Sequence, residues 1–109
     1  MSKKIKRARK PRRVRYNQRN VLDPQYVKWR RDVKKRDGHQ CQWAGCKKKR
    51  GLNIHHIRRW AEFPTLRFVI GNGITLCYEH HKAIQGQEDN YAIMFLKILQ
   101  MQAQRNFNG

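Results

Sequence analysis

LNIHHI at residues 52–57 and NGITLCYEHH at residues 72–81 are the two stretches that decide the fold of this chain. Each contains β-branched residues and has a glycine beside it, so we predict short strands at 52–57 and 73–76. The second strand leads directly into a helix that starts near Tyr78 and that Gly86 breaks. The sequence therefore predicts an α+β core of two strands followed by a helix.

Two further helices are predicted, one on each side of this core. Asp23-Pro24 is typical of a helix start, and Asp37-Gly38 ends this helix near Arg36. Its helically spaced apolar residues, which favour core packing over base stacking, are Tyr26, Trp29 and Val33. A last helix is predicted from about Asp89, followed by a frayed tail at 106–109. Apolar residues expected to hold down the connection 58–71 are Trp60, Phe63, Leu66 and Phe68.

Three cysteines and one histidine form two close pairs, Cys41-x4-Cys46 and Cys77-x2-His80. An odd number of cysteines in a chain without a secretory signal argues against a closed set of disulfides. Three thiolates and one imidazole are instead a ligand set for tetrahedral Zn²⁺, and here protein would fill every position. We therefore predict a closed, structural zinc site, the alternative being three buried cysteines without a metal.

Positive charge dominates the composition. The chain has 26 Lys and Arg against 7 Asp and Glu, which gives a formal net charge of +19. Such a surplus favours a polyanionic partner, and no apolar run approaches the roughly 20 residues that cross a bilayer. The composition therefore predicts a nucleic-acid partner, no membrane association and a cytoplasmic location.

The charge also divides the chain into segments. Residues 1–21 are predicted to be a disordered basic arm, because residues 1–20 hold ten Lys or Arg and no acid. The arm is either a solubilising tail or a phosphate-binding segment, and its one-sided charge favours phosphates, with candidate contacts Lys3, Lys4, Arg12 and Arg13. Residues 22–105 are predicted to form one domain, small enough to need a metal for stability.

The histidines outside the predicted zinc site carry a resemblance to a known family. His55-His56 in the first strand, Asn72 before the second and His81 in the following helix resemble the His-Asn-His motif of HNH endonucleases. WAEFP at 60–64 and LRF at 66–68 are similar to the connecting loop of the small, zinc-containing phage members. The resemblance covers residues 33–85.

This resemblance implies a ββα-metal (His-Me finger) fold that holds one catalytic divalent ion beside the structural zinc. His56 matches the general base and Asn72 the residue that orients it, whereas His55 and His81 match ligands of Mg²⁺, Mn²⁺ or another divalent ion. His80 takes the place of a zinc-binding cysteine. Basic residues that flank the motif, and that are either phosphate contacts or a solvated face, are Arg58, Arg59 and Lys82.

The activity implied by the resemblance is metal-dependent hydrolysis of DNA phosphodiester bonds, by nicking or double-strand cutting, with phage packaging proteins as suggested partners. The chain departs from the pattern at Gln85, where some relatives have a third metal-binding histidine, and at Gly71, where many have aspartate. Neighbouring residues of an ideal strand also point to opposite faces, so His55 and His56 can reach one site only if the strand ends or twists there.

Two other functions explain part of the sequence. A non-catalytic zinc-containing module that binds DNA or RNA would account for the charge and the cysteines, as would an RNA-binding or ribosome-associated protein. Only a nuclease gives a reason for His56, Asn72 and His81 together.

Overall fold

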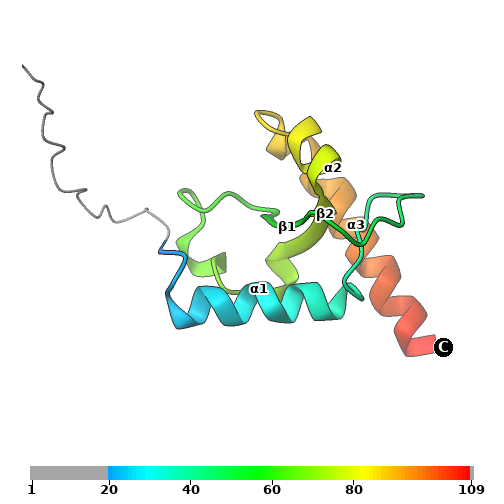
Figure 1. The fold of residues 1–109 in the computed structure, drawn as a ribbon, viewed down its shortest axis with the longest axis horizontal. Coiled ribbons are helices and arrows are strands. Elements are labelled where there is room, and N and C mark those ends of the chain that lie inside the picture. Colours follow the sequence, from blue (N-terminus) through cyan, green and yellow to red (C-terminus); the bar gives the residue numbers. More distant parts are fainter. Residues whose placement is uncertain (1–19, 109) are drawn as a thin grey trace, which may run out of the picture.

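A computed structural model describes residues 20–108 of the chain. Figure 1 traces its elements in chain order, which are helix α1 (Pro24–Arg36), strand β1 (Leu52–His56), the 3-10 helices η1 (Pro64–Leu66) and η2 (Ile70–Asn72), strand β2 (Gly73–Cys77), helix α2 (Tyr78–Ala83) and helix α3 (Glu88–Asn108). The small α+β fold predicted from the sequence is confirmed. The predicted arm, including Lys3, Lys4, Arg12 and Arg13, lies outside the described residues except for its last two positions.

The predicted bounds of α1 and of both strands agree with the observed ones to within one residue, and larger differences occur only at the helix ends after β2. Helix α2 ends at Ala83, three residues before Gly86, and the backbone then turns into α3. Helix α3 continues to Asn108, whereas the predicted domain ended at residue 105. Phe63 was also placed wrongly, because its side chain is 38% exposed and does not hold down the connection.

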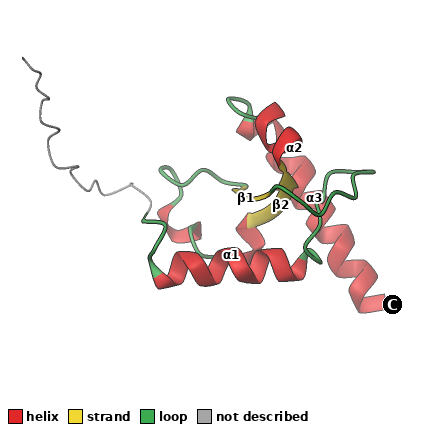
Figure 2. Cartoon of the chain, viewed as in Figure 1, coloured by secondary structure: helices red, strands yellow, loops and turns green. Residues whose placement is uncertain are grey.

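The two-stranded antiparallel hairpin is covered on both faces, as Figure 2 shows with α1 running below it and α3 passing behind. Its register pairs Leu52 with Cys77 and His56 with Gly73. The face toward α3 builds one core, centred on Ile57, Ile74, Leu76, Ile84, Ala92 and Phe95. The face toward α1 builds a second core, which contains Tyr26, Trp29, Val33 and Trp60. Every residue of β2 is buried, because α1 covers one face of this strand and α3 covers the other.

Helix α1 approaches β2 very closely at Gly73. A side-chain carbon built at this glycine would lie 2.6 Å from Trp29 and 2.7 Å from Val33. Glycine is therefore required here by space and not by backbone conformation, since its φ is −126°. This close contact brings the Trp29 ring over the end of β1, where it meets the candidate site described below.

Asp37 joins α1, β2 and α3 through one buried carboxylate. Its side chain is fully buried and accepts two hydrogen bonds from the Arg36 guanidinium, at 2.8 and 2.9 Å. It also accepts from the backbone N–H of Thr75 and from Gln102 Nε2, each at 2.9 Å. Each oxygen of the Asp37 carboxylate therefore accepts two hydrogen bonds. A buried ion pair is tolerated when its polar atoms are satisfied in this way.

We expect Asp37→Ala to lower the free energy of unfolding by about 3–5 kcal/mol, because it leaves a half-buried guanidinium and a buried backbone N–H without their acceptor. Urea denaturation followed by circular dichroism measures this change. Asp32→Ala is the matched control, since Asp32 pairs with the exposed Lys28 at the surface of the same helix and should cost less than about 1 kcal/mol. Equal losses in the two variants would show that the Asp37 network carries no special stability.

Within residues 20–108, no helix has both the length and the apolar character that crossing a membrane requires.

Candidate functional site

The predicted zinc ligands come together in one cluster. The ligand atoms of Cys41, Cys46, Cys77 and His80 all lie within 4.8 Å of one another. His80 Nδ1 is 3.2 Å from Cys77 Sγ and 3.6 Å from Cys41 Sγ. Tetrahedral zinc bonds would separate a sulfur and a nitrogen ligand by about 3.5 Å, which these distances match. The Cys3His cluster is therefore close enough to hold a metal ion such as zinc.

The loop that carries the first two cysteines is shaped by its own backbone. The N–H of Cys46 donates to the carbonyl of Trp43 at 2.8 Å across a tight turn. Gly45 lies at the third position of this turn with a φ of +81°, a conformation that glycine adopts without steric cost. The Cys41 N–H donates to the Lys48 carbonyl at 2.9 Å, so both cysteines are positioned by backbone hydrogen bonds.

Side-chain packing then fixes the loop against the rest of the domain. The Trp43 ring stacks on the imidazole of His80 with centroids 4.5 Å apart and an interplanar angle of 4°. Trp43 also contacts Phe95 of α3, and the Gln42 N–H donates to the Thr75 carbonyl at 2.9 Å. The cluster thus connects the loop at 38–51, the end of β2 and the first turn of α2.

Burial and neighbouring charges act in opposite directions on the thiols of the cluster. Burial raises the pKa of the Cys41 thiol to about 11 without a metal, so an arriving cation must displace its proton. Zinc with three thiolates and one neutral imidazole carries one net negative charge. Residues 47–50, four consecutive cations, follow Cys46 directly and offset this charge.

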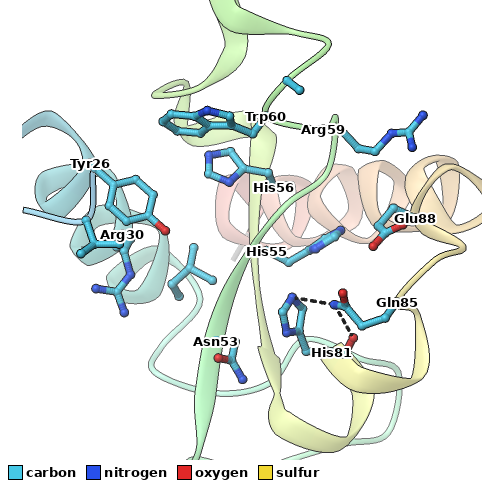
Figure 3. A pocket seen from close by; sticks show the side chains of 13 residues that line it. Tyr26, Arg30, Asn53, His55, His56, Arg59, Trp60, His81, Gln85 and Glu88 are labelled. Carbon is cyan, nitrogen blue, oxygen red and sulfur yellow. Dashed lines mark hydrogen bonds between the residues drawn. The ribbon is translucent and has the colours of Figure 1, made fainter. Parts of the chain in front are cut away.

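A separate cleft of about 800 Å³ lies at the end of β1. His55 and His56 from β1 and His81 from α2 line it, and α1 contributes Tyr26 and Arg30 (Figure 3). None of the four Cys3His residues lines this cleft. The histidines of the sequence motif therefore share one cavity that is distinct from the cysteine cluster.

His55 and His81 lie next to each other in this cleft. Their ring centroids are 5.5 Å apart, and His55 is buried with its ring against Phe95. Two imidazoles that share one ion at about 2.1 Å place their centroids about 5 Å apart, so the pair fits a common divalent ion. Gln85 Nε2 lies 3.3 Å from His81 Nε2, and binding through this nitrogen would exchange that hydrogen bond for the metal.

His56 lies on the opposite face of β1, as the alternation of a regular strand requires. Its ring stacks on Trp29 at 3.9 Å and meets Trp60 edge-on at 5.3 Å. His56 Nε2 is 3.0 Å from the carbonyl oxygen of Arg67. Because a carbonyl can only accept, Nε2 carries the proton of the neutral ring and Nδ1 keeps the lone pair. The ring is therefore held in the tautomer that a general base needs, through a backbone carbonyl.

Asn72 does not touch His56 but fixes the loop that does. Its Oδ1 accepts from the Arg58 N–H at 2.8 Å, and its Nδ2 donates to the carbonyls of Arg58 and Leu66 at 3.2 Å. Leu66 precedes Arg67, whose carbonyl holds the imidazole of His56. Asn72 therefore has no direct hydrogen bond to His56, and its side chain is linked to that ring only through residues 58–67.

Glu88 and Arg30 also line the cleft, although neither belongs to the predicted site residues. Arg30 lies one turn after Tyr26 on α1, with its guanidinium 5.9 Å from the centre of that ring. Glu88 lies in the first turn of α3. Burial opposes its ionisation, but backbone N–H groups of Glu88 and Gly86, the His55 ring in its protonated, metal-free form and the Arg59 guanidinium together lower its pKa. No local sequence pattern signals either residue, since only the tertiary fold brings α1 and α3 to the cleft.

The basic residues predicted to contact phosphates differ in their exposure and in the groups with which they already interact. Arg59 lines the cleft and is exposed, but its guanidinium pairs with Glu62 and Asp89, each at 3.0 Å. Lys82 is exposed on α2, with its Nζ 5.8 Å from the centre of the Tyr78 ring. The backbone of Arg58 is engaged by Asn72, and its side chain is half-buried. Among the three, Lys82 is thus the cation with the most open surroundings.

Comparisons of the chain with family models, with curated proteins and with solved structures find no match.

Proposed function

We propose that this chain is a metal-dependent endonuclease that hydrolyses DNA phosphodiester bonds, with a ββα-metal fold and a structural zinc ion in its Cys3His cluster. The observation that carries the proposal is the cleft that gathers His55, His56 and His81 beside a separate Cys3His cluster. A binding protein has no need for three buried or half-buried imidazoles in one cavity, since charged groups at the surface suffice for phosphate contacts.

In this proposal the residues of the cleft have different roles in the hydrolysis. His56 is the general base of this proposal: the Arg67 carbonyl holds its Nε2, and its buried Nδ1 would take the proton of the attacking water molecule. His55 and His81 hold a divalent ion, Mg²⁺ or Mn²⁺, which supplies Lewis-acid stabilisation of the scissile phosphate when bound. Arg30 from α1 and Arg59 from the loop after β1 provide positive charge at the cleft for the flanking phosphates.

The stacking of Trp29 on His56 gives this arrangement rigidity. The indole lies against one face of the imidazole, and Trp29 is itself fixed by a hydrogen bond of 2.8 Å from its Nε1 to the carbonyl of Val69. A base that must meet a water molecule at hydrogen-bonding distance gains from such fixing, because misplacement by a fraction of an ångström lowers the rate.

A plasmid-nicking assay tests the proposal. We expect wild-type protein to convert supercoiled DNA into nicked or linear DNA only when Mg²⁺ or Mn²⁺ is added. His55→Ala/His81→Ala should lower the rate about 100-fold or more, because it removes both protein ligands of the ion. The protein should keep its zinc and its affinity for duplex DNA.

His39→Asn is the matched control for the loss of a histidine. His39 is exposed, lies outside the cleft and has a φ of +57°, a conformation that asparagine tolerates better than alanine. It should nick DNA at the wild-type rate. If wild-type protein binds duplex DNA tightly and never nicks it with any divalent ion, the alternative of a non-catalytic zinc-containing nucleic-acid-binding module is correct.

A further inference from the structure

The cleft presents an electrostatic difficulty for any divalent cation. The chain carries a formal net charge of +19, and Arg30 lines the cleft together with Arg59, whose charge is shared with Glu62 and Asp89. Neutral imidazoles such as His55 and His81 supply lone pairs but no negative charge to offset this field. A cation of charge +2 therefore needs an anionic group nearby if it is to bind at ordinary concentrations.

Glu88 is the only acidic side chain among the described residues that line this cleft. It lies at the start of α3, directly after the turn that ends α2. Its Oε2 accepts a hydrogen bond of 3.2 Å from the N–H of Gly86, which anchors the carboxylate at the turn. Figure 3 shows the Glu88 side chain on the same side of β1 as His55 and His81, with its carboxylate toward His55.

The chemistry of the ion points to the same residue. Mg²⁺ and Mn²⁺ prefer oxygen ligands, whereas two imidazoles alone resemble a site for zinc, copper or nickel. The position four residues after His81 holds Gln85, whose amide already contacts His81 and its carbonyl. Within residues 20–108, only the Cys3His set brings three or more metal-binding side chains within direct ligand distance of one another. Glu88 is thus suited to contact the ion through a bound water molecule, which is the way Mg²⁺ commonly meets a carboxylate.

We propose that Glu88 is the outer, oxygen-donating member of the cleft's metal site: its carboxylate accepts a hydrogen bond from metal-bound water and makes the His55–His81 pair selective for hard divalent ions. This inference rests on the proposed function, because it assumes that these two histidines bind a catalytic ion.

The test is Mn²⁺ binding by electron paramagnetic resonance, on zinc-loaded full-length protein without DNA. Glu88→Gln should weaken Mn²⁺ binding about 10–100-fold, the usual cost of losing a group that supports a metal site from its second layer. Asp32→Asn is the matched control, since it removes the same charge from a carboxylate on α1 that pairs with Lys28 and does not line the cleft. Zinc content and circular dichroism verify that each variant is folded.

The possible outcomes distinguish failure of the Glu88 inference from failure of the nuclease proposal. A loss confined to Glu88→Gln, with partial retention in Glu88→Asp, supports the role of the carboxylate. Equal losses in Glu88→Gln and Asp32→Asn would reduce the effect to overall charge and overturn the inference. Wild-type affinity in Glu88→Gln, beside weakened binding in His81→Ala, would also overturn it while leaving the nuclease proposal intact. Wild-type protein that binds no Mn²⁺ would overturn both.

Discussion

Loss of the metal from the Cys3His cluster is expected to unfold the domain, because zinc binding supplies much of its free energy of folding. The loop at 38–51 contains neither helix nor strand, and its contacts with β2 and α2 converge on Cys41, Cys77 and His80. Structural zinc in small domains contributes on the order of 10 kcal/mol or more, which exceeds the stability of most domains of this size. Zinc analysis should give one tightly held ion per chain, and chelation should abolish the cooperative thermal transition seen by circular dichroism.

Cys41→Ser tests this expectation by mutation. Cys41 is buried, and serine at this position is both a poor zinc ligand and an additional buried hydroxyl. We expect the variant to be unfolded or insoluble and to lack zinc. His80→Cys is the matched control, because it keeps four protein ligands of a type that zinc accepts and should retain both metal and fold. A Cys41→Ser protein that remains folded with a full equivalent of zinc would show that the cluster is not the structural site.

The sequence predicted those features that depend on neighbouring residues. Helix α1 begins after Asp23, whose side chain accepts from the N–H of Gln25 at 2.8 Å, and it ends at Asp37. Both ends follow from local capping, so Asp23-Pro24 and Asp37-Gly38 were sufficient signals. The Cys3His cluster was predictable for a similar reason, since the spacing of each pair suits shared ligation and the remaining requirement is only that the two pairs meet.

Features that depend on distant residues could not be predicted in the same way. The sequence predicts only that Asp37 ends a helix, yet its carboxylate also accepts a hydrogen bond from Gln102, 65 residues further along the chain. The resemblance implied that Asn72 orients His56, but the carbonyl that holds the His56 ring belongs to Arg67, and its position is set by the path of the loop. Glu88 enters the cleft only because α3 crosses the hairpin. Such contacts are fixed by tertiary packing, and nothing in a local pattern reports them.

His56→Ala is expected to abolish nicking while leaving the metal in place, which distinguishes a general base from a ligand. General-base catalysis by a positioned side chain contributes about 10²–10⁴-fold, so the rate should fall by that factor. The His56 ring lies on the face of β1 opposite His55 and packs against Trp29 and Trp60, so Mn²⁺ affinity should stay within about twofold of wild type. Single-turnover nicking with saturating Mn²⁺, beside binding measured by electron paramagnetic resonance, gives both quantities.

The stacked position of His56 makes a second variant necessary, since alanine leaves a cavity beneath two indole rings and could lower activity by disturbing the fold. His56→Gln fills more of that space and keeps a polar group near the Arg67 carbonyl, but it has no lone pair basic enough to take a proton from water. We therefore expect His56→Gln to unfold at a higher urea concentration than His56→Ala and yet to be equally inactive. If activity instead follows stability across the two variants, His56 is a packing residue, and the base that activates water lies elsewhere in the cleft.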